Sequence, residues 1–153
     1  MADAENPGAE GRILALDVGK KRIGLAVSDE LRITAQGLAT LERTRIRDDL
    51  QRLKEIAGEL GVSLLLVGRP LHLSGAESRQ SEYTREFATR LSEYTGVPVV
   101  YWDERLTSVE AERILKDAGA VLENRKRSVD RLAAVLLLES YLGYLENARG
   151  SLG

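Results

Sequence analysis

The stretch that most constrains the fold of this chain is 13–27, Ile-Leu-Ala-Leu-Asp-Val-Gly-Lys-Lys-Arg-Ile-Gly-Leu-Ala-Val. Two short apolar runs flank a tight Gly-Lys-Lys-Arg connection, which is the pattern of a β-hairpin at the front of a domain. Asp17 lies at the end of the first run, where a sheet core normally contains valine or isoleucine. A carboxylate there is costly to remove from water unless it is paired, hydrogen-bonded or bound to a metal. The hairpin therefore predicts a strand pair that carries a functional acid.

Size and composition predict a single soluble domain. With 153 residues, 43% hydrophobic and 30% charged, the chain is typical of a one-domain globular protein. We expect the domain to span residues 11–147, between flexible tails at 1–10 and 148–153. The first residues are acidic and lack the apolar stretch of a signal peptide, and the longest apolar run, Leu132–Leu138, is too short to cross a bilayer. We therefore expect a cytoplasmic protein without a membrane partner.

The first half of the chain predicts an antiparallel sheet, then a helix and a buried strand. The expected antiparallel strands are 12–18, 22–28 and 32–40. Strands joined so closely must pair antiparallel, because parallel neighbours need a long crossover. Thr44 is expected to cap a helix that stops at Gly61. The apolar run 62–67 then indicates a strand buried on both faces of a parallel sheet.

The second half predicts further helices around one more strand. Ser74 and Glu77 form a capping box for a helix. The expected core face of that helix is Tyr83, Phe87, Leu91 and Tyr94. The elements expected after it are a strand at 97–102, a helix opened by a capping box at 107–110 and reaching about 117, a loop at 118–127 and a last helix at 128–146.

This order of elements predicts an α/β fold with a mixed five-stranded sheet. Three antiparallel strands come first, two parallel strands follow through helical crossovers, and helices cover both faces. The last helix is apolar over most of its circumference. We expect it to be deeply buried or partly committed to a partner subunit, which leaves a homodimer open.

Three acids fall where α/β sheets collect functional groups. Asp17 ends the first strand, Glu104 follows the strand at 97–102, and Asp130 lies near the start of the last helix, where the helix dipole favours a negative charge. Since the chain has no cysteine and one histidine, this set predicts hard, oxygen-liganded cations such as Mg²⁺ or Mn²⁺. Two such ions suit phosphodiester hydrolysis, because they activate water and stabilise the leaving oxygen.

Each candidate also has a structural interpretation. Asp17 fits an Asx-turn before Gly19, although its apolar flanks favour a functional role. Taken singly, Glu104 is more typical of a salt-bridged surface residue and Asp130 of a first-turn helix acid. Arg69, after a buried strand, fits a phosphate contact and a structural ion pair equally well.

Two basic clusters interrupt a weakly acidic chain. They are Lys20-Lys21-Arg22 and Arg125-Lys126-Arg127. The formal net charge is −2, but a local patch can bind phosphates whatever the total. Each cluster alone is more typical of a solvated turn, whereas beside a phosphodiester site the first would lie close to a bound backbone.

Four sequence blocks together resemble the YqgF/RuvX family. The blocks are 16–26, Leu-Asp-Val-Gly-Lys-Lys-Arg-Ile-Gly-Leu-Ala; 67–75, Val-Gly-Arg-Pro-Leu-His-Leu-Ser-Gly; 103–108, Asp-Glu-Arg-Leu-Thr-Ser; and 129–134, Val-Asp-Arg-Leu-Ala-Ala. They occur in the family's order across most of the chain. The resemblance implies an RNase H-like fold, shared with Holliday-junction resolvases, transposases and ribonuclease H. It also implies a nuclease that matures the 5′ end of pre-16S ribosomal RNA, with a resolvase-like role on branched DNA proposed for some members.

The resemblance further implies roles for the matching positions. Asp17, Glu104 and Asp130 would be the carboxylates of a two-metal site. Phosphate contacts would come from Arg22, Arg69, Arg105 and Thr107.

Two other classes of function stay open at this point. An actin-like ATPase or sugar kinase also has an Asp-x-Gly phosphate loop between two strands, although such folds use two lobes and this chain has length for one. A non-catalytic RNA-binding module would rely on the basic clusters instead of the acids. The sequence leaves RNA and DNA substrates, and endo- and exonucleolytic cleavage, equally open.

Overall fold

The computed structural model describes residues 10–69, 79–103 and 122–152, with side chains of the last helix described from 130 to 150. Its elements are β1 (Arg12–Val18), β2 (Arg22–Ser28), β3 (Ala35–Gly37), β4 (Leu41–Glu42), α1 (Ile46–Leu60), β5 (Val62–Arg69), α2 (Arg79–Thr95), β6 (Val99–Asp103) and α4 (Leu122–Leu152). They form a six-stranded mixed sheet in the order β3-β2-β1-β5-β6, with β4 pairing with the other end of β2.

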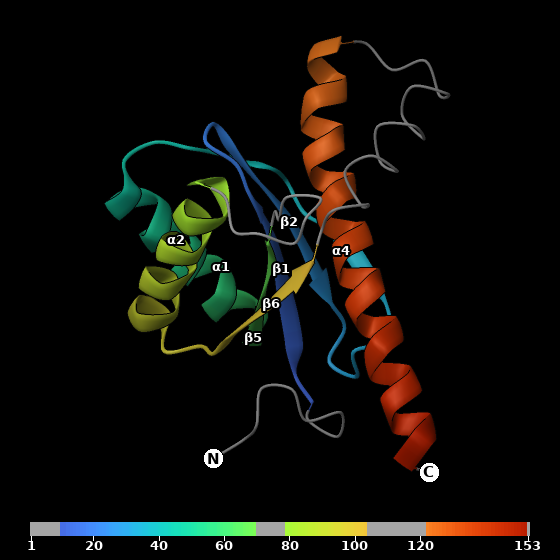
Figure 1. Cartoon of the computed structure of the whole chain (residues 1–153). Helices are drawn as coiled ribbons and strands as arrows, with labels where there is room; N and C mark the ends of the chain where they lie inside the picture. The colour runs from blue at the N-terminus through green and yellow to red at the C-terminus, as the bar shows by residue number, and fades with distance from the viewer. Residues whose placement is uncertain (1–9, 70–78, 104–121, 153) are drawn as a thin grey trace.

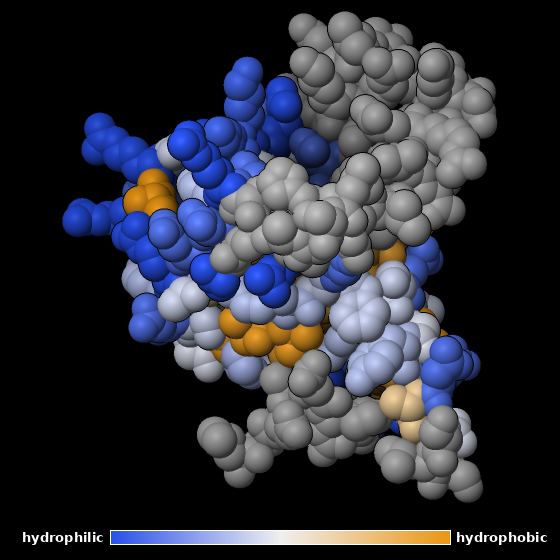
Figure 2. All heavy atoms as spheres, in the orientation of Figure 1, coloured by the Kyte–Doolittle hydropathy of each residue, from blue (hydrophilic) through white to orange (hydrophobic). Residues whose placement is uncertain are grey.

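The sheet joins an antiparallel half to a parallel half, as predicted. Strand β2 pairs antiparallel with β1, β3 and β4, and β5 pairs parallel with both β1 and β6. Helices α1 and α2 cover one face and α4 runs along the other (Figure 1). The outer surface of α1 and α2 is mostly hydrophilic, with one small apolar patch (Figure 2).

Alternation along β1 divides the core into two clusters. Leu14 and Leu16 pack in the cluster under α1 and α2, whereas Ile13 and Ala15 pack in the cluster under α4. Successive side chains of a strand point to opposite faces, so a strand between two helical layers needs apolar residues on both. This explains the continuous apolar runs in the sequence of β1, β2 and β5.

The expected third strand, 32–40, is wrong in its extent. The structure has two short strands there, β3 and β4, and both pair with β2. A turn occupies 29–34, where Asp29 accepts hydrogen bonds from the N–H groups of Ile33 and Thr34 at 2.7 and 2.8 Å. Arg32 has a positive φ of 60°, which is incompatible with a strand.

Two expected details of the helices are also wrong. The N-cap of α1 is Arg45, without a side-chain cap; Thr44 instead donates from its N–H and hydroxyl to Asp49, at 3.0 and 2.9 Å. Tyr94 is 42% exposed; it lies in the last turn of α2, and the Lys54 ammonium lies over its ring. The expected capping boxes at 74–77 and 107–110 lie outside the described residues.

Helix α4 is longer than predicted at both ends, with 31 residues over about 46 Å. The loop expected at 118–127 is wrong for 122–127, which are helical. Asp130 was expected near the start of this helix, and that is wrong too, because Asp130 lies beyond the first two turns of α4. The sequence 123–128 is polar but contains no glycine or proline, and arginine, lysine and glutamate are good helix formers. Residues 148–152 are helical too; the domain boundaries and the flexibility of the tails stay predictions.

The apolar face of α4 is committed to this chain's own core. Its fully buried side chains pack on β1, β2 and β5; among them are Ala134, Leu137, Leu138 and Tyr141. Deep burial therefore accounts for the apolar sequence, and a homodimer stays a prediction. Within the described ranges, no helix is long and apolar enough to cross a membrane.

Candidate active site

Asp17 lies on the α4 face of the sheet. It continues the alternation of Ile13 and Ala15, whose side chains pack against α4. It is partly buried and pairs with Gly24 of β2 in the antiparallel ladder. The acid that the hairpin sequence singled out thus faces the last helix rather than α1 and α2.

Gly24 lets α4 approach the sheet beside Asp17. A Cβ at this position would overlap the carbonyl oxygen of Asp130 and lie 2.6 Å from its carbonyl carbon. No side chain fits there, so the backbone of α4 rests directly on β2. Since Gly24 is the ladder partner of Asp17, this contact brings Asp130 next to Asp17.

The two carboxyl groups interact electrostatically. The pKa of Asp130 is raised from 3.8 to about 6, first by burial and then by the negative charges of Asp17 and Glu42, while Arg22 opposes the shift. Like charges at close range disfavour a second ionisation. The neighbourhood of Asp130 therefore favours binding of a positive charge, which a proton or a cation can supply.

Arg22 and Glu42 complete the described part of the site. They are opposite each other in the β2–β4 ladder, and Arg22 Nε is 3.1 Å from a Glu42 carboxylate oxygen. Arg22 has the same parity along β2 as Gly24, so it shares the α4 face. Arg22 was expected from the sequence; Glu42 was not, because nothing in its local sequence separates it from an ordinary surface glutamate.

Gly24 was also missed as a site residue, although the sequence carried a signal. An isolated glycine inside a strand pattern indicates a close approach of another backbone. The signal shows that something approaches, but it does not identify α4 as the element that does.

Several expected site residues cannot be placed. Glu104, Arg105 and Thr107 lie outside the described residues, as do the side chains of 125–127, whose backbone is in the first turns of α4. In the parts of the chain that the structure describes, no group of three or more acids or histidines could hold a metal ion. The three-carboxylate site therefore stays a prediction that depends on Glu104.

Lys20 and Lys21 are exposed in the β1–β2 turn. Arg43 braces this turn, because it donates through Nη1 to the Gly19 carbonyl oxygen at 2.8 Å. Both lysine side chains are therefore open to solvent in the turn that follows β1, three and four residues after Asp17.

Arg69 is not brought together with the two acids. It is half-buried at the end of β5, and its Nε donates to the hydroxyl of Ser81 in α2 at 3.5 Å. Val67, two residues earlier, packs in the core under α1 and α2, so alternation places Arg69 on that face too. The structure favours the structural interpretation of this arginine.

Comparison with known proteins identifies the family of this chain. Residues 11–144 match the model of the family RuvX, described as Holliday junction resolvase. The chain belongs to the RuvX family. It is 45% identical over 141 residues to a protein of Agathobacter rectalis and 50% identical over 138 residues to one of Koribacter versatilis, both named "Putative pre-16S rRNA nuclease". These matches cover 90% of this RuvX-family chain and 99% and 90% of the relatives.

Solved structures confirm the RNase H-like fold of this RuvX-family chain. The T. thermophilus RuvC structure in complex with a Holliday junction substrate has a TM-score of 0.55 at 16% identity, covering 88% of this chain and 95% of that one. The Fowlpox virus resolvase with Holliday junction DNA has a TM-score of 0.54 at 14% identity, covering 88% and 98%. At such identities the likeness concerns the fold.

Proposed function

We propose that this RuvX-family protein is a metal-dependent nuclease that hydrolyses phosphodiester bonds. The observation that carries the proposal is the pairing of Asp17 with Asp130 on one face of the sheet, where the pKa of Asp130 is raised to about 6 by burial and by neighbouring negative charge. Neighbouring carboxylates repel one another and lower the stability of the folded state, and carboxyl groups with strongly shifted pKa values are concentrated at functional sites. A bound divalent cation would remove this repulsion.

The donor set fits Mg²⁺ or Mn²⁺. Carboxylate oxygens are the ligands that these hard cations prefer, and we propose Asp17, Asp130 and Glu104 as the residues that hold them. Glu104 follows β6 directly. The ladder pairs Trp102 with Gly68 of β5, one step beyond the Leu16–Val67 pair of β1 and β5, so β6 ends at the level of Asp17.

The chemistry follows from these residues. Bound divalent ions would polarise the scissile phosphate and activate water for an in-line displacement, without a side-chain nucleophile. Asp17 lies on a central strand and Asp130 on a helix packed against the sheet, and such regular elements position side chains more accurately than loops do. Arg22 supplies a positive charge beside them for a phosphate oxygen, and Lys20 and Lys21 add positive charge in the β1–β2 turn.

For the substrate we propose the 5′ end of pre-16S ribosomal RNA, which places the protein in the cytoplasm. The support is the name shared by relatives at 45% and 50% identity. A second candidate is branched DNA, favoured by the fold shared with two resolvases solved with Holliday junctions. We propose further phosphate contacts from Arg105, Thr107 and the cluster Arg125-Lys126-Arg127, whose backbone lies about one turn before Asp130 on α4.

The deciding experiment measures cleavage of structured RNA and of a four-way DNA junction in Mg²⁺ or Mn²⁺. Asp17→Asn should reduce the cleavage rate by at least about 10³-fold, because a metal ligand is lost. The matched control is Asp48→Asn, an exposed acid of α1 on the other face, which should cut at the wild-type rate.

Each outcome has a distinct meaning. Equal cleavage by wild type and Asp17→Asn would identify the activity as a contaminant and refute the mechanism. RNA binding without cleavage by any variant would favour a non-catalytic binding module. Preferential cutting of the junction would assign the protein to branched DNA.

A further inference from the structure

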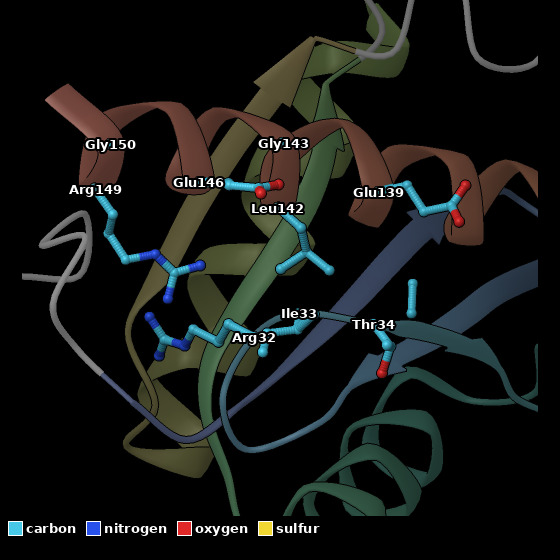
Figure 3. A pocket seen from close by; sticks show the side chains of 10 residues that line it. Arg32, Ile33, Thr34, Glu139, Leu142, Gly143, Glu146, Arg149 and Gly150 are labelled. Carbon is cyan, nitrogen blue, oxygen red and sulfur yellow. The ribbon is translucent and has the colours of Figure 1, made fainter.

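A pocket lies beside the C-terminal half of α4. This pocket, of about 910 Å³, opens between the turn after β2 and the C-terminal half of α4. Its lining includes Arg32, Ile33, Leu142 and Arg149, which Figure 3 shows from close by. Along the helix axis Arg149 is about 28 Å from Asp130, so this pocket is separate from the candidate active site.

Arg32 is buried with its hydrogen-bonding capacity incompletely used. It is 3% exposed, its Nε donates to the Gly11 carbonyl oxygen at 2.8 Å, and its Nη2 donates to the hydroxyl of Ser63 at 3.1 Å. Its Nη1 is buried and has no hydrogen-bond partner among the described residues. A buried, unpaired guanidinium nitrogen is costly, and its backbone is held at a positive φ of 60°.

Arg149 brings a second positive charge to the same place. Figure 3 shows the guanidinium groups of Arg32 and Arg149 pointing toward one another. Arg149 makes a 3.5 Å contact with the Leu31 carbonyl oxygen, and among the described residues neither arginine forms an ion pair. Both groups therefore keep donors that a ligand can use.

Acidic residues of the pocket do not neutralise this pair. Glu139 and Glu146 also line it, but in Figure 3 their carboxylates point away from the two guanidinium groups. Burial and the charge of Arg149 lower the pKa of Arg32, while Tyr141 opposes this. Two like charges held together without a carboxylate between them are the arrangement that an anion stabilises.

We propose that this pocket is a binding site for a small phosphomonoester. Two facing guanidinium groups match the charge of a phosphate monoester, about −1.5 to −2 at neutral pH, better than the single charge of a carboxylate. Leu142, Ala35 and Ile33 offer apolar surface for the rest of the ligand. The volume falls in the usual range of small-molecule pockets, and a guanidinium as buried as Arg32 suits an entering small ligand rather than a polymer backbone.

Titration calorimetry at constant ionic strength tests this, with phenyl phosphate, inorganic phosphate and benzoate as probes. Phenyl phosphate should bind most tightly and benzoate most weakly. Arg149→Gln should weaken phenyl phosphate binding about tenfold or more, since one charge-assisted hydrogen-bond donor is lost. The matched control Arg52→Gln, an exposed arginine of α1 on the other face, should bind as the wild type does.

Arg22→Gln removes a cation from the candidate active site, and it should bind phenyl phosphate with wild-type affinity because the pocket does not include that site. Absence of binding at millimolar phenyl phosphate, or equal affinity in Arg149→Gln, would overturn the proposal. Binding lost in Arg22→Gln would also overturn it, because it would move the ligand to the active site. Binding of an RNA oligonucleotide at this pocket in preference to the small probes would refute the assignment to a small ligand.

Discussion

The two faces of the sheet shift the pKa of a buried or half-buried aspartate in opposite directions. On the α1 and α2 face, Asp49 is fully buried and accepts hydrogen bonds from Arg43 and Thr44. On the α4 face, Asp130 is half-buried beside Asp17 and Glu42. Burial raises the pKa of both groups, yet the hydrogen bonds from Arg43 and Thr44 bring the pKa of Asp49 below its ordinary value, whereas the pKa of Asp130 reaches about 6.

This difference separates a structural acid from a functional one. Arg43 makes a closed network, because it also donates to the Tyr83 hydroxyl at 2.7 Å and stacks on Phe87 at 4.7 Å from the ring centre. Every charge in that network has a partner, so it holds α1, α2 and the β1–β2 turn together. Asp130 instead lies near like charges, and their repulsion lowers the stability of the folded state.

Asp49→Asn should have the largest effect on stability. Removing the charge leaves the Arg43 guanidinium buried without its counter-ion, and we expect the free energy of unfolding to fall by about 3–5 kcal/mol. Urea denaturation measures this at pH 7.5. The neighbouring exposed acid provides the control, since Asp48→Asn should change stability by less than about 0.5 kcal/mol. A loss in Asp49→Asn no larger than in the control would show that the network is dispensable.

Gly24→Ala tests whether close backbone contact positions Asp130. The new methyl group would overlap the Asp130 carbonyl, so we expect a loss of about 2 kcal/mol and a marked fall in cleavage, because α4 must move. Gly58→Ala is the control: nothing lies within 4 Å of a Cβ there, and a helical alanine should stabilise by up to about 1 kcal/mol. Wild-type stability in Gly24→Ala would show that the helix is not held at this contact.

Asp130→Asn should raise the free energy of unfolding, whereas Asp49→Asn should lower it. A pKa raised from 3.8 to about 6 corresponds to about 3 kcal/mol at full strength, and to about 1–2 kcal/mol after solvent screening. In metal-free buffer at pH 7.5 we therefore expect the variant to be more stable than the wild type by that amount, while it loses cleavage.

The gain in stability from Asp130→Asn should grow as the pH rises. Between pH 3.8 and about 6 the folded state binds more protons at Asp130 than the unfolded state does, so wild-type stability from this group falls as pH rises. The advantage of Asp130→Asn should be full above about pH 6 and vanish below about pH 4. Urea denaturation from pH 4 to 8 measures it. An advantage that is constant with pH would mean that charge repulsion is not its cause.

Divalent cations should have the smallest effect on stability. If Asp17 and Asp130 hold a metal, Mn²⁺ at a few times its Kd should stabilise the wild type at pH 7.5 by about 1 kcal/mol, because it binds only the folded site. Asp17→Asn should lose the shift in melting temperature and Asp48→Asn should keep it. An unchanged melting temperature in millimolar Mn²⁺ would contradict a site formed before substrate binds.

Local pattern was sufficient for most of the fold. The hairpin of β1 and β2, helix α1 with its stop at Gly61 and the buried strand β5 were all predicted near their observed bounds, because alternation and helical spacing depend on neighbouring residues. The predicted start of α4 at 128 is wrong, because the polar run before it predicts a loop, whereas its arginine, lysine and glutamate residues favour a helix. Helical spacing alone predicts Tyr94 in the core, but its neighbours on α1 are the polar side chains Lys54 and Gln51, which the pattern within α2 does not show.

Part of the candidate site was likewise predictable from local sequence, and part was not. Asp17 and Asp130 were singled out by sequence, one as a charge in a strand and the other with its neighbours in a recognisable block. Glu42, the approach at Gly24 and the facing pair Arg32 and Arg149 depend on contacts between elements that are distant in the chain. A long-range contact leaves no periodic signal in either partner.

By itself, then, the sequence determined that β1, β2 and β5 are apolar on both faces, and that an acid interrupts β1 at Asp17. Only the tertiary structure decided that Asp17 faces α4, that Gly24 seats Asp130 beside it, and that Asp49 is paired while Asp130 is crowded. The physical reason is that hydrophobic periodicity is a local property, whereas the energy of a charge depends on its burial and on the distance to every other charge.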